Sequence, residues 1–166
     1  MTNSANVGKE QERHIVRHAK ANGFPGADRI IRTGAGPNYS VRPDEGDIWL
    51  CPGIIIQSKR LSPPNRAERA VAGWLDETRA QCIAAGADYG VLIVRREGTA
   101  DVGEWWAWLC VADVIRLHSG TRIALFNWAR TARMPVRLTV ADAYILLRSS
   151  GYGTPIAETS DWVDEL

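Results

Sequence analysis

Apolar residues recur along the chain with two spacings, one typical of helices and one of strands. Spacings of three and four residues place Ile15, Val16 and Ala19 on the inner face of a helix predicted over 9–22, which ends before Gly23. The other elements predicted up to residue 111 are strands over 29–32, 47–51, 54–59, 89–94 and 104–111, and a second helix over 66–85. Elements that alternate in this way are typical of an α/β fold.

The C-terminal third continues the alternation. We predict a short helix over 112–118, a last strand over 136–138 and a last helix over 139–150, with Thr139 as its N-cap and Gly151 just past its end. A helix, a three-strand meander and a crossover helix imply a mixed central sheet flanked by helices. We therefore expect a single domain over 1–166, with its core at about 8–111, a C-terminal helical extension at 112–151 and an acidic tail at 152–166.

The composition agrees with one compact domain. The chain has 166 residues, of which 45% are hydrophobic, and this suits a single core. No apolar run approaches the roughly 20 residues that span a bilayer, and the first residues are too polar for a secretory signal. Cys51, Cys82 and Cys110 are odd in number and widely spaced, which argues against a disulfide framework and a zinc ribbon. We expect a cytoplasmic protein with no membrane association.

The net charge is only +1, but the charges are unevenly distributed. Residues 9–42 carry seven basic and three acidic side chains, and residues 114–148 carry six arginines against one aspartate. Such stretches could bind a polyanion, and arginine suits phosphate because one guanidinium can contact two oxygens. An ordinary solvated surface explains the same charges, so charge alone does not decide between the two.

Three tryptophans in the predicted strand 104–111 offer a further contact surface. Trp105 and Trp106 point to opposite faces of the strand, and Trp108 shares the face of Trp106. Aromatic side chains can stack on bases, although burial against a helix or in a dimer interface is the commoner reason for them.

A polar cluster is expected where the second and third predicted strands meet. Asp47 follows a glycine at the start of one strand, where its carboxylate can face solvent, and Gln57 and Lys59 end the other strand. The turn at Pro52-Gly53 makes the two strands a hairpin, which brings the start of one beside the end of the other. Gln57 and Lys59 are two positions apart, so their side chains share a face. Carboxylate and amide oxygens suit Mg²⁺, although an ordinary strand pair with polar ends has the same spacing.

Seven short motifs lie in or beside the predicted elements. They are Gly8-x₃-Glu12, Gly23-Phe24, Ala27-x-Arg29, Gly46-Asp47-Ile48, Ile56-Gln57-Ser58-Lys59-Arg60, Trp74-x₂-Glu77-x₃-Gln81 and Tyr89-Gly90-Val91-Leu92-Ile93-Val94. Together they resemble the PD-(D/E)XK nuclease superfamily, and within it the Holliday-junction resolvases of the phage and archaeal kind. The resemblance covers about residues 8–111 and implies a restriction-endonuclease-like core of order α-β-β-β-α-β. It also implies a metal-dependent nuclease, often a homodimer that presents two active sites to a four-way junction.

The resemblance implies a role for each matching residue. Asp47, Glu12 and Gln57 would hold Mg²⁺ or Mn²⁺, and Lys59 would position the attacking water. The residues expected to contact the substrate are Arg29, Arg32, Arg60 and Gln81. Gln57 departs from the family pattern, in which Glu or Asp usually stands there, although a transposon-end endonuclease subunit also carries Gln-x-Lys. An amide oxygen can still bind Mg²⁺, but the site has one negative charge fewer.

We therefore expect a Mg²⁺-dependent endonuclease that hydrolyses DNA phosphodiester bonds, prefers a branched or four-way junction and acts as a homodimer. One alternative is another PD-(D/E)XK activity, such as a restriction, repair or transposon-end nuclease. The other is a DNA-binding or assembly protein that has kept the fold and lost the site through Gln57. Convergence of the four catalytic candidates would favour an enzyme, and their scatter would favour a binding module.

Overall fold

The computed structural model describes residues 4–30, 44–60, 65–119 and 133–156. The helices are α1 (Ser4–Ala21), α2 (Asn65–Ala84), α3 (Val111–Ser119) and α4 (Val140–Ser149), with the 3₁₀ turn η1 (Val102–Glu104). The strands are β1 (Asp28–Arg29), β2 (Ile48–Cys51), β3 (Ile54–Lys59), β4 (Tyr89–Val94), β5 (Trp106–Cys110) and β6 (Pro135–Thr139). Within these ranges, no helix combines the length and the apolar character needed to cross a membrane.

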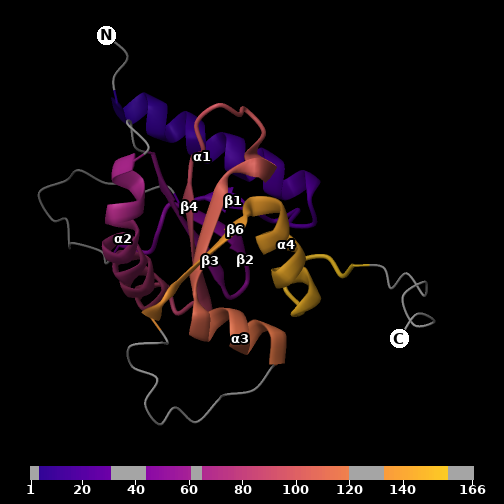
Figure 1. Ribbon diagram of the computed structural model, residues 1–166. Coiled ribbons are helices and arrows are strands. Elements are labelled where there is room, and N and C mark those ends of the chain that lie inside the picture. The colour runs from indigo at the N-terminus through magenta and orange to yellow at the C-terminus, as the bar shows by residue number, and fades with distance from the viewer. Residues whose placement is uncertain (1–3, 31–43, 61–64, 120–132, 157–166) are drawn as a thin grey trace, which may run out of the picture.

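Six strands form one mixed sheet in chain order, β1-β2-β3-β4-β5-β6. α2 and α4 lie on opposite sides of this sheet (Figure 1). β3 and β4 are parallel, with Ile54 beside Tyr89 and Lys59 beside Val94, and the other neighbouring pairs are antiparallel. A parallel pair requires a crossover connection, which α2 provides. The expected α/β fold with a mixed sheet flanked by helices is confirmed, and α1 to β4 follow the order α-β-β-β-α-β.

Two apolar clusters lie on opposite faces of the sheet. The larger cluster joins α1, α3 and α4 to the sheet and contains the fully buried Trp105. The smaller cluster lies between the sheet and α2. Alternate residues of β4 belong to the two clusters: Val91 and Ile93 to the larger one, Leu92 and Val94 to the smaller one. The continuous apolar run of β4 therefore reflects a strand that is covered on both faces.

The segment expected to be a C-terminal helical extension belongs to this core. β6 pairs with β5 along its whole length, and α4 buries four apolar side chains in the larger cluster. The predicted cap of α4 is confirmed, because the Thr139 hydroxyl accepts a hydrogen bond from the Asp142 backbone N at 3.1 Å. Gly151 follows α4 with a φ of +91°, which suits a glycine at this position.

Three boundaries differ from the expected ones by two or more residues, and the others agree within one residue. α1 begins at Ser4 rather than residue 9, because residues 4–8 contain no proline that would prevent an earlier start. β1 comprises only Asp28–Arg29, and the end of the strand expected over 29–32 lies outside the described residues. β5 begins at residue 106 rather than 104, because the Asp101 carboxylate accepts from the Gly103 N at 2.8 Å and caps η1.

His18 lies where α1 meets α4. Its ring centre is 5.8 Å from that of Tyr144, and its Nε2 atom is buried without a hydrogen-bond partner among the described residues. Burial lowers the pKa of this imidazole below its usual value of 6.5, and the charge of Asp101 opposes the shift. The folded protein therefore favours the neutral form of His18.

We expect the free energy of unfolding to fall as the pH is lowered below 6.5, because the unfolded chain then binds a proton that folded His18 resists. The contribution of neutral His18 is complete above its unfolded-state pKa and is lost as the pH falls through the lower folded-state pKa. Denaturant unfolding between about pH 5 and 8 measures this dependence. His18→Gln should flatten it, whereas His14→Gln, which removes an imidazole 3.1 Å from Glu10, should retain it. An unaltered profile in His18→Gln would assign the dependence to other groups.

Candidate functional site

Asp47 lies just before β2 and is held against β3 by two hydrogen bonds. Its backbone N donates to the Ile56 carbonyl at 3.0 Å, and its Oδ2 accepts from the Ser58 backbone N at 2.7 Å. Gly46 permits this close approach, because its φ is +99° and a Cβ there would lie 3.3 Å from the Ile56 carbonyl oxygen. The expectation of a solvent-facing carboxylate is corrected: the side chain is half-buried, because it accepts from the backbone of the neighbouring strand.

Burial raises the pKa of Asp47 above its usual value of 3.8. The Ser58 N–H and the Lys59 charge oppose this shift, and the negative charges of Glu12 and Asp44 add to it. One carboxylate thus responds to groups from α1, from the segment before β2 and from the end of β3. Its Oδ1 atom makes no hydrogen bond in the described structure. A partly buried carboxylate with a raised pKa and an unengaged oxygen is typical of a functional site.

Gln57 and Lys59 point to the same face of β3, as predicted, and both contact Glu77 of α2. Lys59 Nζ donates to Glu77 Oε2 at 2.8 Å, and Gln57 Nε2 donates to the same oxygen at 3.3 Å. Gln57 is 4% exposed, and its amide oxygen, expected to face a metal, accepts from the Thr78 hydroxyl at 2.6 Å. Gln57 is therefore a buried link between β3 and α2.

Glu77 is the candidate to which the sequence assigned no role. Its side chain is 53% exposed, and the hydrogen bond from Lys59 holds its pKa below the usual value of 4.5. Glu77 is therefore charged at neutral pH, and its Oε1 atom makes no hydrogen bond in the described ranges. Its only sequence signal was its place on the crossover helix, because the pairing with Lys59 depends on how α2 packs on β3.

Glu12 forms a separate pair with Arg29. Their side chains are 18% and 20% exposed, and Glu12 Oε2 accepts from Arg29 Nε at 2.6 Å. The guanidinium expected to contact phosphate is thus bound to a carboxylate of the protein. Glu12 acts on Asp47 through its charge, but no hydrogen bond joins it to Gln57 or Lys59 in the described structure. The four catalytic candidates therefore occupy neighbouring hydrogen-bonded groups rather than one converged cluster.

The remaining expected substrate contacts lie in different environments. Arg60 is exposed directly after β3. Gln81 is 5% exposed, and its Oε1 atom is buried without a partner among the described residues, so its amide lies inside the protein. Arg32 lies outside the described residues. Of the three, Arg60 alone has a described position from which it can reach a substrate.

Gln11 supports the site from the face of the sheet opposite Gln57. Its Nε2 atom donates to the Ser58 hydroxyl at 2.7 Å and to the Lys59 carbonyl at 3.0 Å, and the residue is 4% exposed. These bonds fix α1 against the end of β3. Sequence reasoning missed Gln11, although it stands four residues before Ile15 on the inner face of the first helix.

The donor types fit a hard divalent cation. Asp47 and Glu77 each keep one carboxylate oxygen without a hydrogen bond in the described structure, and Mg²⁺ is usually bound by one or two carboxylates together with water and phosphate. Among the described residues, no three carboxylate, imidazole or thiol groups already form a cation site. Asp47 and Glu77, which both interact with Lys59, are therefore two carboxylates that could each offer one oxygen to Mg²⁺ or Mn²⁺.

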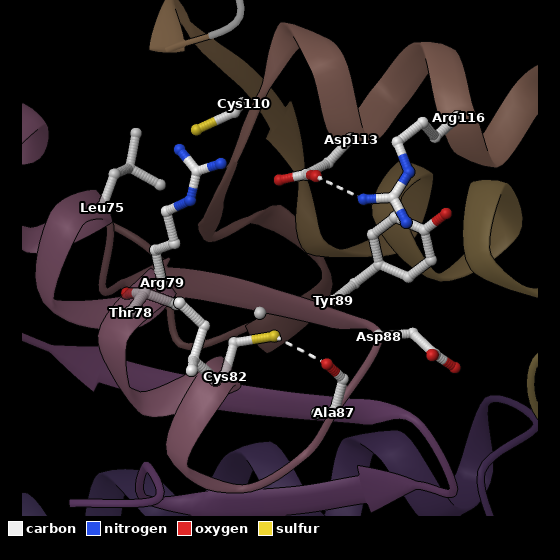
Figure 2. Close-up of a pocket in the computed structure, with 12 residues that line it drawn as sticks. Leu75, Thr78, Arg79, Cys82, Ala87, Asp88, Tyr89, Cys110, Asp113 and Arg116 are labelled. Carbon is white, nitrogen blue, oxygen red and sulfur yellow. Dashed lines mark hydrogen bonds and ion pairs between the residues drawn. The ribbon is translucent and has the colours of Figure 1, made fainter. Parts of the chain in front are cut away.

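A separate cavity of about 230 Å³ opens at the opposite end of the central strands, between α2, α3 and the start of β4 (Figure 2). Its lining carries both signs of charge: the Arg116 guanidinium lies 5.0 Å from the centre of the Tyr89 ring and 3.7 Å from the Asp113 carboxylate. Burial raises the pKa of Asp113. Among the expected site residues that the structure describes, none lines this cavity.

Comparisons of the chain with protein-family models, with curated proteins and with solved structures gave no match. The resemblance to PD-(D/E)XK nucleases rests on the motifs of this chain. What that resemblance implies about activity is therefore proposed from the geometry around Asp47, Lys59 and Glu77.

Proposed function

We propose that the protein is a metal-dependent endonuclease with a restriction-endonuclease-like core that hydrolyses DNA phosphodiester bonds. The observation that carries this proposal is the hydrogen bond of Asp47 to the backbone of Ser58, the residue between Gln57 and Lys59. It brings a carboxylate and an ammonium to one edge of the sheet. The α-β-β-β-α-β order from α1 to β4 supports the same class of enzyme.

The proposed roles follow from the charges and contacts of each side chain. Asp47 and Glu77 hold the metal, and Glu77 supplies the carboxylate that Gln57 lacks. Bound Mg²⁺ provides positive charge that polarises a phosphoryl group and lowers the pKa of a water. Lys59, 2.8 Å from Glu77, donates a hydrogen bond to the attacking water or to a phosphate oxygen. Glu12 contributes negative charge from α1.

A non-cleaving DNA-binding or assembly protein is the second candidate. The contacts of Gln57 favour it, as does the separation of the four catalytic candidates into different hydrogen-bonded groups. Its oxygen accepts from Thr78 and its nitrogen donates to Glu77, so the amide is engaged within the protein and adds no charge. Glu12 is also engaged, with Arg29. If Glu77 does not hold metal, Asp47 alone remains, and a single carboxylate makes a weak divalent-cation site.

A panel of DNA substrates separates the candidates. A linear duplex, a flap and a four-way junction of related sequence are incubated with Mg²⁺, Mn²⁺ or Ca²⁺, with EDTA as the control. We expect cutting with Mg²⁺ and Mn²⁺, greatest on the four-way junction, because the motifs of this chain resemble those of Holliday-junction resolvases, which often act as homodimers. Preferential cutting of the linear duplex would favour a restriction or repair activity. Binding without cutting under any metal would favour the second candidate.

A further inference from the structure

Three arginines lie together beside Lys59, at the ends of two strands. Arg60, Arg95 and Arg96 line an open pocket of about 320 Å³ together with Glu97 and Gly98. The parallel register of β3 and β4 brings them together, because it sets the ends of the two strands side by side. The Arg95 backbone N also donates to the Lys59 carbonyl at 3.1 Å, so the pocket adjoins the candidate site.

The charge of this pocket is not neutralised by the described protein groups. In the described part of the chain, no carboxylate pairs with Arg60, Arg95 or Arg96. Glu97 is the one acidic residue in the described lining, which leaves a net charge of +2. Arg60 and Arg96 are exposed and Arg95 is half-buried. Unpaired guanidinium groups gathered in this way attract an anion with several phosphates.

Two of these arginines, Arg95 and Arg96, lie over tryptophan rings. The Arg95 guanidinium lies 5.4 Å from the ring centre of Trp105, and that of Arg96 lies 4.6 Å from the ring centre of Trp106. Arg137 of β6 is also 4.6 Å from Trp106. A stacked guanidinium keeps its N–H groups in the plane of the group, where they can donate to phosphate oxygens. Because arginines already contact these indoles, the tryptophans act as supports for arginine rather than as stacking surfaces for bases.

We propose that Arg60, Arg95 and Arg96 bind successive backbone phosphates of the DNA strand that leads to Lys59. The choice of DNA as the polyanion rests on the proposed function. The surface binds without regard to base sequence, because guanidinium groups on phosphates carry no base information. It thereby aligns the strand with Asp47, Lys59 and Glu77.

The test is the salt dependence of DNA binding by the Arg60→Ala/Arg95→Ala/Arg96→Ala protein. Binding of a labelled 30-base-pair duplex (about three helical turns) is measured in EDTA, so that cutting does not interfere. Each lost phosphate contact should reduce the slope of log K against log salt by about 0.9, so the three should reduce it by about 2.7. A fourfold rise in salt weakens binding about 3.5-fold per contact. An unchanged slope would overturn the proposal.

A matched control removes three positive charges elsewhere. Arg13→Ala/Arg17→Ala/Arg79→Ala changes exposed arginines of α1 and α2, and its slope should stay close to that of the unmodified protein. An equal loss in this control would show a diffuse charge effect and would overturn the proposal.

A milder variant guards against loss of folding, because Arg95 contacts the buried Trp105. Arg60→Ala/Arg96→Ala should lower the slope by about 1.8. An unchanged slope in this folded double variant would also overturn the proposal. Cutting in Mg²⁺ is assayed separately. If the arginine variants lose binding and the unmodified protein never cuts DNA, the arginine surface is supported and the nuclease is contradicted. If the variants bind DNA as before and the unmodified protein cuts it, the nuclease is supported and the arginine surface is contradicted.

Discussion

Asp47→Asn should reduce DNA cleavage by at least about 100-fold, the loss expected when an electrostatic contact worth about 2.7 kcal/mol is removed from a catalytic site. The substitution removes the charge that would hold a divalent cation. It keeps the volume of the side chain and an oxygen that can accept from the Ser58 N, now 2.7 Å from Asp47 Oδ2. Cleavage is measured on the preferred DNA under single-turnover conditions, so that chemistry rather than product release is compared.

The same variant should be more stable than the unmodified protein at neutral pH. Burial raises the pKa of Asp47, so between the unfolded-state and folded-state pKa values the folded protein binds more protons than the unfolded chain. The stability of the unmodified protein therefore falls as the pH rises through this window. Above the window, the charged carboxylate destabilises the folded state by its full amount. The neutral amide of the variant would carry no such charge. We expect the melting temperature to rise by about 2–4 °C for each kcal/mol gained.

Asp113→Asn is the matched control for Asp47→Asn. Burial raises the pKa of Asp113 as well, but this side chain lines the cavity at the opposite end of the central strands, between α2 and α3. Asp113→Asn should raise the melting temperature and leave cleavage unchanged. Full cleavage by a folded Asp47→Asn protein would contradict the assignment of the active site. A stability gain without loss of cleavage would show that the buried charge of Asp47 contributes neither to the stability of the fold nor to cleavage.

Glu77→Gln should weaken Mn²⁺ binding and cleavage by about 10- to 100-fold, the size of effect seen when a group that supports a metal site is removed. Glu77 is the charged group that joins Lys59 and Gln57, and it supplies the carboxylate that the β3 motif lacks. The introduced amide would keep an oxygen for the Lys59 ammonium, so the loss would report the charge rather than the hydrogen bond. Calorimetric titration with Mn²⁺ and a cleavage assay on the same samples measure the two effects.

Exchanging the residues at positions 57 and 77 tests whether Glu77 supplies the carboxylate that the family pattern has at position 57. Gln57→Glu/Glu77→Gln has the same net charge as the unmodified protein and should recover most of the metal affinity lost in Glu77→Gln. Gln57→Glu alone should tighten metal binding, although its cleavage need not rise, because added negative charge opposes the DNA phosphates. Unchanged Mn²⁺ affinity in Glu77→Gln would exclude Glu77 as a ligand and favour the non-cleaving alternative. Unchanged affinity in Gln57→Glu would mean that residue 57 does not contact the metal.

The local pattern of the sequence determined most of the secondary structure. The strands predicted over 54–59 and 89–94 have those bounds in the structure, and Thr139 caps α4 as predicted. The hairpin that brings Asp47 beside Gln57 and Lys59 was also predictable, because ten residues and one tight turn set its register. Each of these features depends on residues that are near one another in the chain. Apolar spacing, caps and turn residues are sufficient to encode such features.

Only the tertiary structure decided which distant groups meet at this edge of the sheet. Glu77 lies on α2 and reaches Lys59 because the crossover helix packs over β3. Gln11 reaches Ser58 across 47 positions, and Arg95 lies beside Arg60 because β3 and β4 are parallel and in register. The spacing of residues shows which face of an element is apolar, but not which polar residue of another element lies opposite it. That pairing depends on the packing of the helices on the sheet and on the register of strands joined by a crossover.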